Sequence, residues 1–201
     1  MSYNCNNKDF SSNMIDDTIS CGCDDDQLLI LKGACSEDKL RGLLTVDTET
    51  TWTQIFIPEV LCIPEQKPDV KQIISITSIP EIFSQRVVKT PLSGTIEIIN
   101  DEEVFTPIEN QEGTILTGRK LIIEGLLKQK VIYTASLYNQ PLHSAHFDVP
   151  FSAFIILPFN TPLTQKYKIE PCIEDIFVCR VTERQIFKNI TLFVKATPLV
   201  C

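Results

Sequence analysis

Histidine, tryptophan and glycine are scarce in this sequence of 201 residues, which contains two, one and seven of them, respectively. With His143 and His146 as the only imidazoles, a Ser/His/Asp or Cys/His triad has almost no freedom to form. Asp148 could orient His146 for base catalysis, but this spacing of two residues is also typical of the solvated face of a strand. The glycines form no phosphate-binding motif. We therefore expect that the protein is not an enzyme.

Positive charge and long apolar runs are scarce as well. The 18 Lys and Arg residues are outnumbered by 26 Asp and Glu residues, which gives a formal net charge of -8. Because excess carboxylates repel phosphates, we expect no nucleic-acid partner. No apolar run reaches the roughly 18 residues of a membrane helix, so no membrane span is predicted. Residues 1–5 lack the basic and apolar regions of a signal peptide, which predicts synthesis in the cytoplasm without a cleaved signal.

Cysteine, in contrast, is abundant, with eight residues in this chain. Such usage is typical either of disulfides in an oxidising compartment or of metal ligation. Zinc sites usually present two pairs of ligands, with about two to four residues between the members of a pair, and Cys21-Gly22-Cys23 with scattered single cysteines departs from that spacing. We therefore predict disulfides and neither a metal nor another cofactor. Oxidation after the producing cell has lysed would reconcile the cysteines with the missing signal peptide.

The cysteines fall into two groups by position. Those near the chain ends are candidates for disulfides between subunits, namely Cys5, Cys21, Cys23 and Cys201. Cys62, Cys172 and Cys179 lie in predicted strands among apolar neighbours, and we interpret them as buried packing residues. Because Cys172 and Cys179 are an odd number of positions apart, they would lie on opposite faces of one strand and are not expected to pair with each other.

Residues 1–34 are predicted to form an N-terminal arm rich in Cys and Asp. Residues 1–26 contain many Asn, Ser and Asp residues but few large apolar ones, so this acidic stretch cannot bury enough surface to order itself and is expected to be poorly ordered. A short apolar run follows, consisting of Leu28, Leu29, Ile30 and Leu31. This run is predicted to form a strand that could add to the open edge of a neighbouring subunit.

Residues 35–201 are predicted to form one β-rich domain. Val, Ile and Thr alternate with polar residues in many segments, with turn signals between them. The expected strands lie within 43–63 and at 73–79, 86–90, 95–99, 120–138, 143–156, 167–181 and 186–196. The acidic stretch near 100–119 is interpreted as a polar insertion or long loop. Many short strands predict an all-β fold, and we expect an antiparallel β-sandwich.

Three further features qualify this pattern. Pro58, Pro64, Pro68 and Pro80 cannot donate to a sheet ladder, so they are expected at strand starts, edges or turns. Only residues 36–44 approach a helical pattern, and Gly42 interferes with it. The single Trp52 is interpreted as a core residue, while a sugar-stacking surface is the alternative.

Three segments together resemble the SPOCS domain, which occurs in spore-coat-associated proteins of endospore-forming bacteria. Residues 57–74, with the sequence IPEVLCIPEQKPDVKQII, resemble the opening of that domain. Residues 121–133 are similar to its G-x-L-x-x-x-x-x-Y strand, with the glycine at 125 and the tyrosine at 133. Residues 149–154 are similar to its "ipFs" element. The resemblance covers roughly residues 50–196.

This resemblance implies a β-rich module that takes part in spore-envelope assembly through protein contacts, with no enzymatic activity attributed to it. Some members carry a LysM-type tail or several copies of the module, whereas this chain has one copy and ends at Cys201, which favours a building block. We therefore hypothesise a structural, self-assembling protein of the spore surface, made in the mother-cell cytoplasm. Its subunits would be joined by strand addition and disulfides into a homo-oligomer or fibre in the coat, exosporium or an appendage, in contact with other spore-envelope proteins. The alternative is a binding or adaptor module that recruits other envelope proteins or a glycan.

Overall fold

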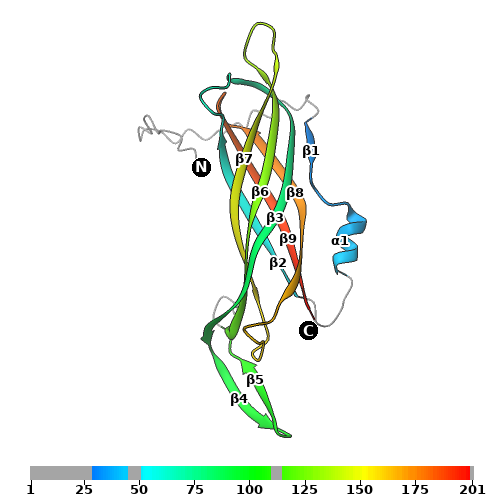
Figure 1. The fold of residues 1–201 in the computed structure, drawn as a ribbon, viewed down its shortest axis with the longest axis vertical. Coiled ribbons are helices and arrows are strands. Elements are labelled where there is room, and N and C mark those ends of the chain that lie inside the picture. The colour runs from blue at the N-terminus through cyan, green and yellow to red at the C-terminus, as the bar shows by residue number, and fades with distance from the viewer. Residues whose placement is uncertain (1–28, 45–50, 110–114, 200–201) are drawn as a thin grey trace.

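A computed structural model describes residues 29–44, 51–109 and 115–199, and these form an elongated β-sandwich with one short helix (Figure 1). The elements in chain order are β1 (Ile30–Lys32), α1 (Glu37–Leu44), β2 (Thr51–Cys62), β3 (Val70–Leu92), β4 (Gly94–Ile99), β5 (Glu102–Pro107), β6 (Thr117–Ala135), β7 (Leu142–Ile156), β8 (Tyr167–Arg180) and β9 (Gln185–Pro198). The all-β prediction is confirmed. The acidic arm predicted over residues 1–26 lies outside the described residues.

Two sheets make up the body of the sandwich. The first sheet has the strand order β1-β3-β6-β7, and the second has the order β2-β9-β8. Every pair of neighbouring strands is antiparallel except β1, which runs parallel to β3. Strands β4 and β5 form a separate two-stranded hairpin that projects from one end of the sandwich (Figure 1).

The core lies between the inner faces of the two sheets. On β9 the alternate residues Ile190, Leu192, Val194 and Ala196 are fully buried, as the alternation in the sequence predicts. Leu121, Ile123, Leu127 and Val131 on β6 are buried in the same way on the opposing sheet. Burying alternate side chains of both sheets is what makes the two layers one domain.

Helix α1 forms although Gly42 lies within it. Ser36 caps its N-terminus, because the Ser36 side-chain oxygen accepts a hydrogen bond of 3.3 Å from the backbone N–H of Lys39. Glu37 and Asp38 occupy the first turn, where negative charge is stabilised by the helix dipole. The end signals of this segment therefore outweigh the cost of its glycine.

Strand β3 joins two segments that the sequence pattern divides, at 73–79 and 86–90. It runs without interruption from Val70 to Leu92, and four register shifts against β6 absorb its irregular stretches. Pro80 lies within it, at a position where β6 is the partner and β1 does not reach. At Pro80, β3 is therefore the edge strand of its sheet, as expected. Strand β5 and the start of β6 occupy part of the stretch near 100–119 that was interpreted as a polar insertion or long loop.

Candidate functional site

Residues 30–35, which we call the strap, cross from the edge of the first sheet to the edge of the second. Ile30 and Leu31 of β1 pair with Ser75 and Ile76 of β3. At its other end, the strap forms an isolated parallel bridge to β8, where the backbone N–H of Cys35 donates to the carbonyl of Ile173 at 2.8 Å. The strap thus joins two strand edges that otherwise belong to different sheets (Figure 1).

A disulfide fastens the end of the strap to the second sheet. It joins Cys35 to Cys172 of β8, with 5.8 Å between their Cα atoms and 137 positions between them in the sequence. Cys172 is fully buried, as expected, but its interpretation as an unlinked packing residue is wrong. Cys62 and Cys179 are disulfide-bonded as well, so the same correction applies to them. The strand pattern gives the face on which a cysteine lies, whereas its partner comes from another element.

Gly33 allows the strap to pass close to β3. Its φ angle is 116°, a region that side-chain-bearing residues rarely adopt. A Cβ atom added at this position would lie 1.9 Å from the carbonyl oxygen of Ser78. The crossing therefore requires glycine at position 33.

The remaining predicted site residues lie partly outside the described residues. This applies to Leu28 and to all the candidate intersubunit cysteines, namely Cys5, Cys21, Cys23 and Cys201. Within the strap, Ile30 and Leu31 are 43% and 42% exposed, and both pair with β3 of their own chain. Addition of this strand to a neighbouring chain stays a prediction.

Two seams run along the sandwich where strands of different sheets face each other, β3 beside β8 and β2 beside β7. Each of these four strands contains a proline, namely Pro80, Pro171, Pro58 and Pro150, respectively. Each proline pairs with a residue of the central strand of its sheet, β9 or β6. Because proline has no N–H, it keeps the hydrogen bonds to that strand intact only where its nitrogen points the other way, toward the seam. Prolines therefore oppose further strand pairing along both seams, and the strap binds beside them, at residues 75–77 of β3 and at Ile173 of β8.

The β2–β7 seam contains a cavity of about 840 Å³ whose lining includes Glu59, His146 and Asp148. The amino group of Lys188 lies behind it, 3.8 Å from Glu59 Oε2 and 3.4 Å from the carbonyl oxygen of Ile57. Lys188 is fully buried on the inner face of β9, and desolvation lowers its pKa to about 8, against the opposing attraction of Glu59. Burial in turn raises the pKa of Glu59, partly offset by Lys188. The pair is a charged contact at the edge of a mainly apolar core.

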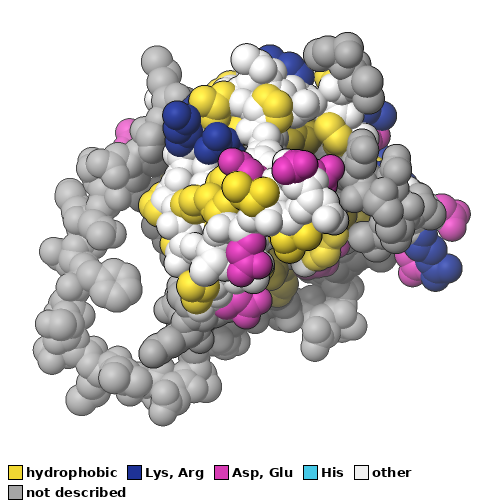
Figure 2. Space-filling view, turned by 90° about the horizontal axis from the view of Figure 1, so that it is seen from below, with side chains coloured by type: hydrophobic (Ala, Val, Ile, Leu, Met, Phe, Trp, Pro, Cys, Tyr) yellow, Lys and Arg dark blue, Asp and Glu magenta, His cyan; other side chains and the backbone are white. Residues whose placement is uncertain are grey.

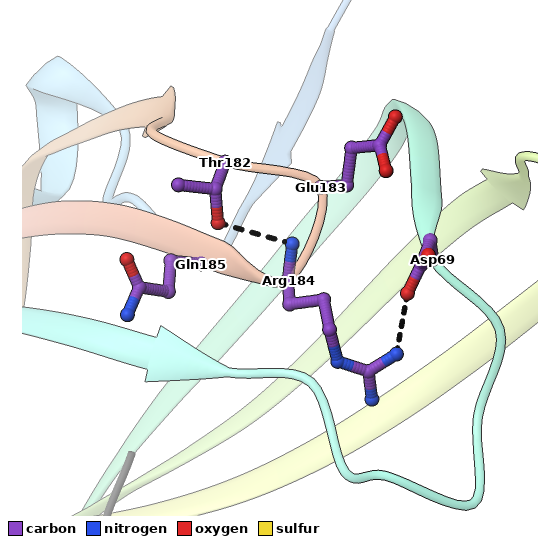
Figure 3. A pocket seen from close by; sticks show the side chains of 5 residues that line it. All are labelled: Asp69, Thr182, Glu183, Arg184 and Gln185. Carbon is purple, nitrogen blue, oxygen red and sulfur yellow. Dashed lines mark hydrogen bonds and ion pairs between the residues drawn. The ribbon is translucent and has the colours of Figure 1, made fainter. Parts of the chain in front are cut away.

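A second hollow, of about 430 Å³, lies at the β8–β9 turn and is lined by residues including Asp69, Glu183 and Arg184 (Figure 3). The guanidinium of Arg184 points toward Asp69 and the loop between β2 and β3 (Figure 3). It forms an ion pair with Asp69 and donates to the carbonyl oxygens of Ile63, Pro64 and Lys67 at 3.1, 2.8 and 3.3 Å.

This arrangement makes Arg184 a clamp on the loop of residues 63–69. The backbone supports it, because Val70 N–H donates to the Glu183 carbonyl at 2.7 Å and Ile63 N–H to the Arg184 carbonyl at 2.9 Å. The Tyr133 hydroxyl also donates to the Pro68 carbonyl at 3.1 Å. Because the guanidinium is engaged by loop acceptors, the hollow is a structural joint and not an anion site. The sequence pattern gives no sign of this role for Arg184.

The outer face of β2 is apolar and aromatic. Trp52, Phe56 and Val60 are 53%, 70% and 46% exposed, because the alternate residues Ile57 and Leu61 face the core. The interpretation of Trp52 as a core residue is therefore wrong. Its ring stacks on Phe193 of β9, with 5.5 Å between ring centroids, and the rest of the indole faces outward. This surface is the second candidate site of the protein.

Within the described ranges, no three or more His, Cys, Asp and Glu side chains are grouped so that they could hold a metal ion. Likewise, no helix in that part of the chain is long and apolar enough to cross a membrane.

Comparison with protein families assigns the central part of this sandwich. The family model described as SipL, SPOCS domain, matches residues 69–181, which begin at the loop clamped by Arg184 and end with β8. This span is more than half of the chain, and the protein belongs to the SPOCS domain family. Membership indicates a spore-associated protein. Searches of curated proteins and of solved structures found no match.

Proposed function

We propose that this protein is a structural, self-assembling subunit of the spore surface, located in the coat, the exosporium or an appendage. Its subunits are joined by strand addition and disulfides. The observation that carries the proposal is the strap, a strand held across two sheet edges by three paired residues, one bridge and the disulfide between Cys35 and Cys172. Family membership supports the spore context.

The strap is suited to exchange between subunits. All copies present identical edges at β3 and β8, so a strap from a neighbouring copy makes the same backbone bonds as the chain's own strap. Few bonds hold the strap before oxidation, because β1 pairs over Ile30–Lys32 and Ala34 forms a single bridge. Once Cys35 is oxidised with Cys172 of the next copy, the contact becomes covalent and durable. Oxidation after lysis of the mother cell places this step at the spore surface.

Isotope mixing tests the exchange. Unlabelled and ¹⁵N-labelled protein are reduced, combined and reoxidised, and peptides containing the Cys35–Cys172 bond are analysed by mass spectrometry. We expect bonds that join one labelled and one unlabelled peptide, together with a ladder on non-reducing gels that collapses with reductant. A Cys35→Ser/Cys172→Ser variant is the control for bonds formed by other cysteines. Bonds confined to peptides of one isotope, with a monomer on the gel, would contradict the proposal.

A binding or adaptor module is the second candidate, and the exposure of Trp52 and Phe56 favours it. Exposed aromatic rings suit either a sugar ring or an apolar protein surface. Pull-downs with spore peptidoglycan and with coat extract separate these ligands, and Trp52→Ala tests the surface. We expect retention to fall severalfold in this variant if the surface binds. Equal retention of Trp52→Ala and the unaltered protein would exclude this surface.

A further inference from the structure

The β4–β5 hairpin projects from one end of the sandwich. Its turn residues Asn100 and Asp101 have φ angles of 53° and 66°, which is the pattern of a tight type I′ turn. At its base, the ring of Phe105 stacks on Phe159, with centroids 5.1 Å apart. No other described strand pairs with β4 or β5. The hairpin is thus anchored at its base and has two free edges at one end of the long axis of the molecule (Figure 1).

Apolar side chains are exposed on this hairpin. Ile98 is 75% exposed, and Ile96, Ile99 and Val104 are 47%, 49% and 40% exposed. Seen from this end, hydrophobic side chains lie beside Asp and Glu side chains (Figure 2). Ile96 and Ile98 lie on the same face of this small projecting sheet. Exposed apolar side chains of this kind are typical of a contact surface, because burying them against a partner is favourable.

The opposite end of the molecule is also apolar. There the β6–β7 turn exposes Leu137, Tyr138 and Leu142 by 52%, 102% and 66%. Backbone bonds fix this turn, because Gln140 N–H donates to the Leu137 carbonyl at 2.9 Å and Ser136 N–H to the Asp69 carbonyl at 2.8 Å. The two ends of the long axis therefore both carry ordered, exposed apolar side chains (Figure 1).

Charge distinguishes the two ends. Residues 93–116, which include the hairpin, contain six Asp and Glu residues and neither Lys nor Arg. Residues 51–92 and 117–198, which include the sandwich strands β2, β3 and β6 to β9, contain fourteen Lys and Arg against ten Asp and Glu, a net charge of +4. At the turn end, the exposed Lys71 follows Val70, which pairs with Ala135 beside the turn. An acidic hairpin is repelled by another hairpin, whereas residues 133–143 at the β6–β7 turn contain no Asp or Glu and do not repel it.

We propose that the β4–β5 hairpin docks on the β6–β7 turn of a second copy, with Ile98 and its neighbours packing against Leu137 and Tyr138. This inference rests on the proposed self-assembly and adds a contact to it. The two surfaces differ and lie at opposite ends, so the contact is head-to-tail and does not close on itself. Repetition along the long axis produces a fibre, to which the strap adds a second, covalent contact.

Two variants that each block one end give the test. Ile98→Asp charges the hairpin end, and Tyr138→Asp charges the turn end. Both side chains are highly exposed, so we expect neither variant to unfold the sandwich. Phe83→Asp is the matched control, because Phe83 is 65% exposed on β3, away from both apolar clusters. Sedimentation velocity measures the size distribution, and unfolding curves verify that each variant is folded.

These measurements are made with reductant present, so that the strap forms no disulfide between copies. We then expect the unaltered protein and Phe83→Asp to form long assemblies, and each end variant alone to associate about tenfold or more weakly. An equal mixture of the two end variants should form dimers and nothing longer, because one intact hairpin meets one intact turn. If the unaltered protein assembles and both end variants assemble equally well, the end-to-end contact is wrong while the proposed function stands. A mixture without dimers also overturns the contact. If the unaltered protein is a monomer when oxidised and when reduced, the proposed function itself fails.

Discussion

Gly125 of β6 lies directly opposite Phe151 of β7, and the Phe151 ring occupies the space that a side chain at position 125 would need. A Cβ atom on Gly125 would come within 2.5 Å of the ring carbon Cζ and within 2.6 Å of the carbonyl oxygen of Glu81 on β3. Two of the segments that resemble the SPOCS domain therefore interlock here. The pairing is steric, and it needs no chemical role for either residue.

Gly125→Ala should destabilise the fold by about 2–3 kcal/mol, because the added methyl group meets one ring and one backbone atom that cannot both move away. The free energy of unfolding in urea measures the effect. Gly42→Ala on α1 is the matched control, since a Cβ there meets nothing within 4 Å, and it should be neutral or stabilising by up to about 1 kcal/mol. Equal stability of the two alanine variants would contradict the steric explanation.

The clamp on the loop of residues 63–69 gives a second prediction. Arg184→Lys should cost about 2–3 kcal/mol, because an ammonium group has three donors and cannot reproduce the planar guanidinium that reaches Asp69 and three carbonyl oxygens. Arg180→Lys is the control, since Arg180 donates one hydrogen bond of 3.2 Å to the Val70 carbonyl and should cost about 1 kcal/mol or less. Urea unfolding with the disulfides intact measures both changes. A cost for Arg184→Lys no larger than for Arg180→Lys would show that the clamp contributes little.

Strand alternation made the all-β fold predictable from the sequence, whereas edges and crossings were not predictable. The buried face of β9 follows directly from its period of two residues. Trp52 lies on the outer face of β2, and Ile55 and Ile57 on the same strand indicate the inner face in the sequence as well. The period of two residues along β2 therefore predicts the exposure of Trp52 better than the general tendency of a lone tryptophan to be buried.

The site depends on contacts that a linear pattern does not contain. The strap reaches β8 from a position 137 residues away, so neither the Cys35–Cys172 pair nor the seam it spans has a local signal. Arg184 looked like any turn residue, because its acceptors are carbonyl oxygens that every residue possesses. Gly33 alone gave a partial signal, since a glycine after a short apolar run indicates an unusual backbone position.

Lys188 predicts a pH dependence of stability. Its pKa is lowered from 10.5 to about 8 in the folded protein, so between these values the unfolded chain binds more protons than the folded one. Stability therefore rises as the pH increases through this range, by about 2 kcal/mol between pH 8 and pH 10 from this group alone. Urea unfolding at fixed ionic strength across this range measures the slope. The raised pKa values of Tyr133 and Tyr167 act in the opposite direction above pH 10, so the range ends there.

Two variants assign this slope to the Lys188–Glu59 pair. Lys188→Met removes the titrating amine and should abolish the rise between pH 8 and pH 10. Glu59→Gln removes the attraction that raises the pKa of Lys188, so the rise should begin at lower pH than in the unaltered protein. A slope that is unchanged in Lys188→Met would mean that another group carries the dependence.

The disulfide of the strap gives the last prediction. Replacing both partners in Cys35→Ser/Cys172→Ser opens a loop of 137 residues, and the entropy of the unfolded chain then favours unfolding by up to about 5 kcal/mol. Disulfides typically contribute about 2–4 kcal/mol, less than this upper value, and we expect a loss of that size in urea unfolding. Gly33→Ala displaces the strap from Ser78 and leaves both cysteines in place. Comparison of the two variants therefore distinguishes the contribution of the backbone contacts of the strap from that of its disulfide. If the strap is held mainly by its backbone bonds, Gly33→Ala should increase proteolysis of residues 30–44 more than the serine variant does. If the disulfide dominates, as the few backbone bonds lead us to expect, the serine variant should be cleaved faster.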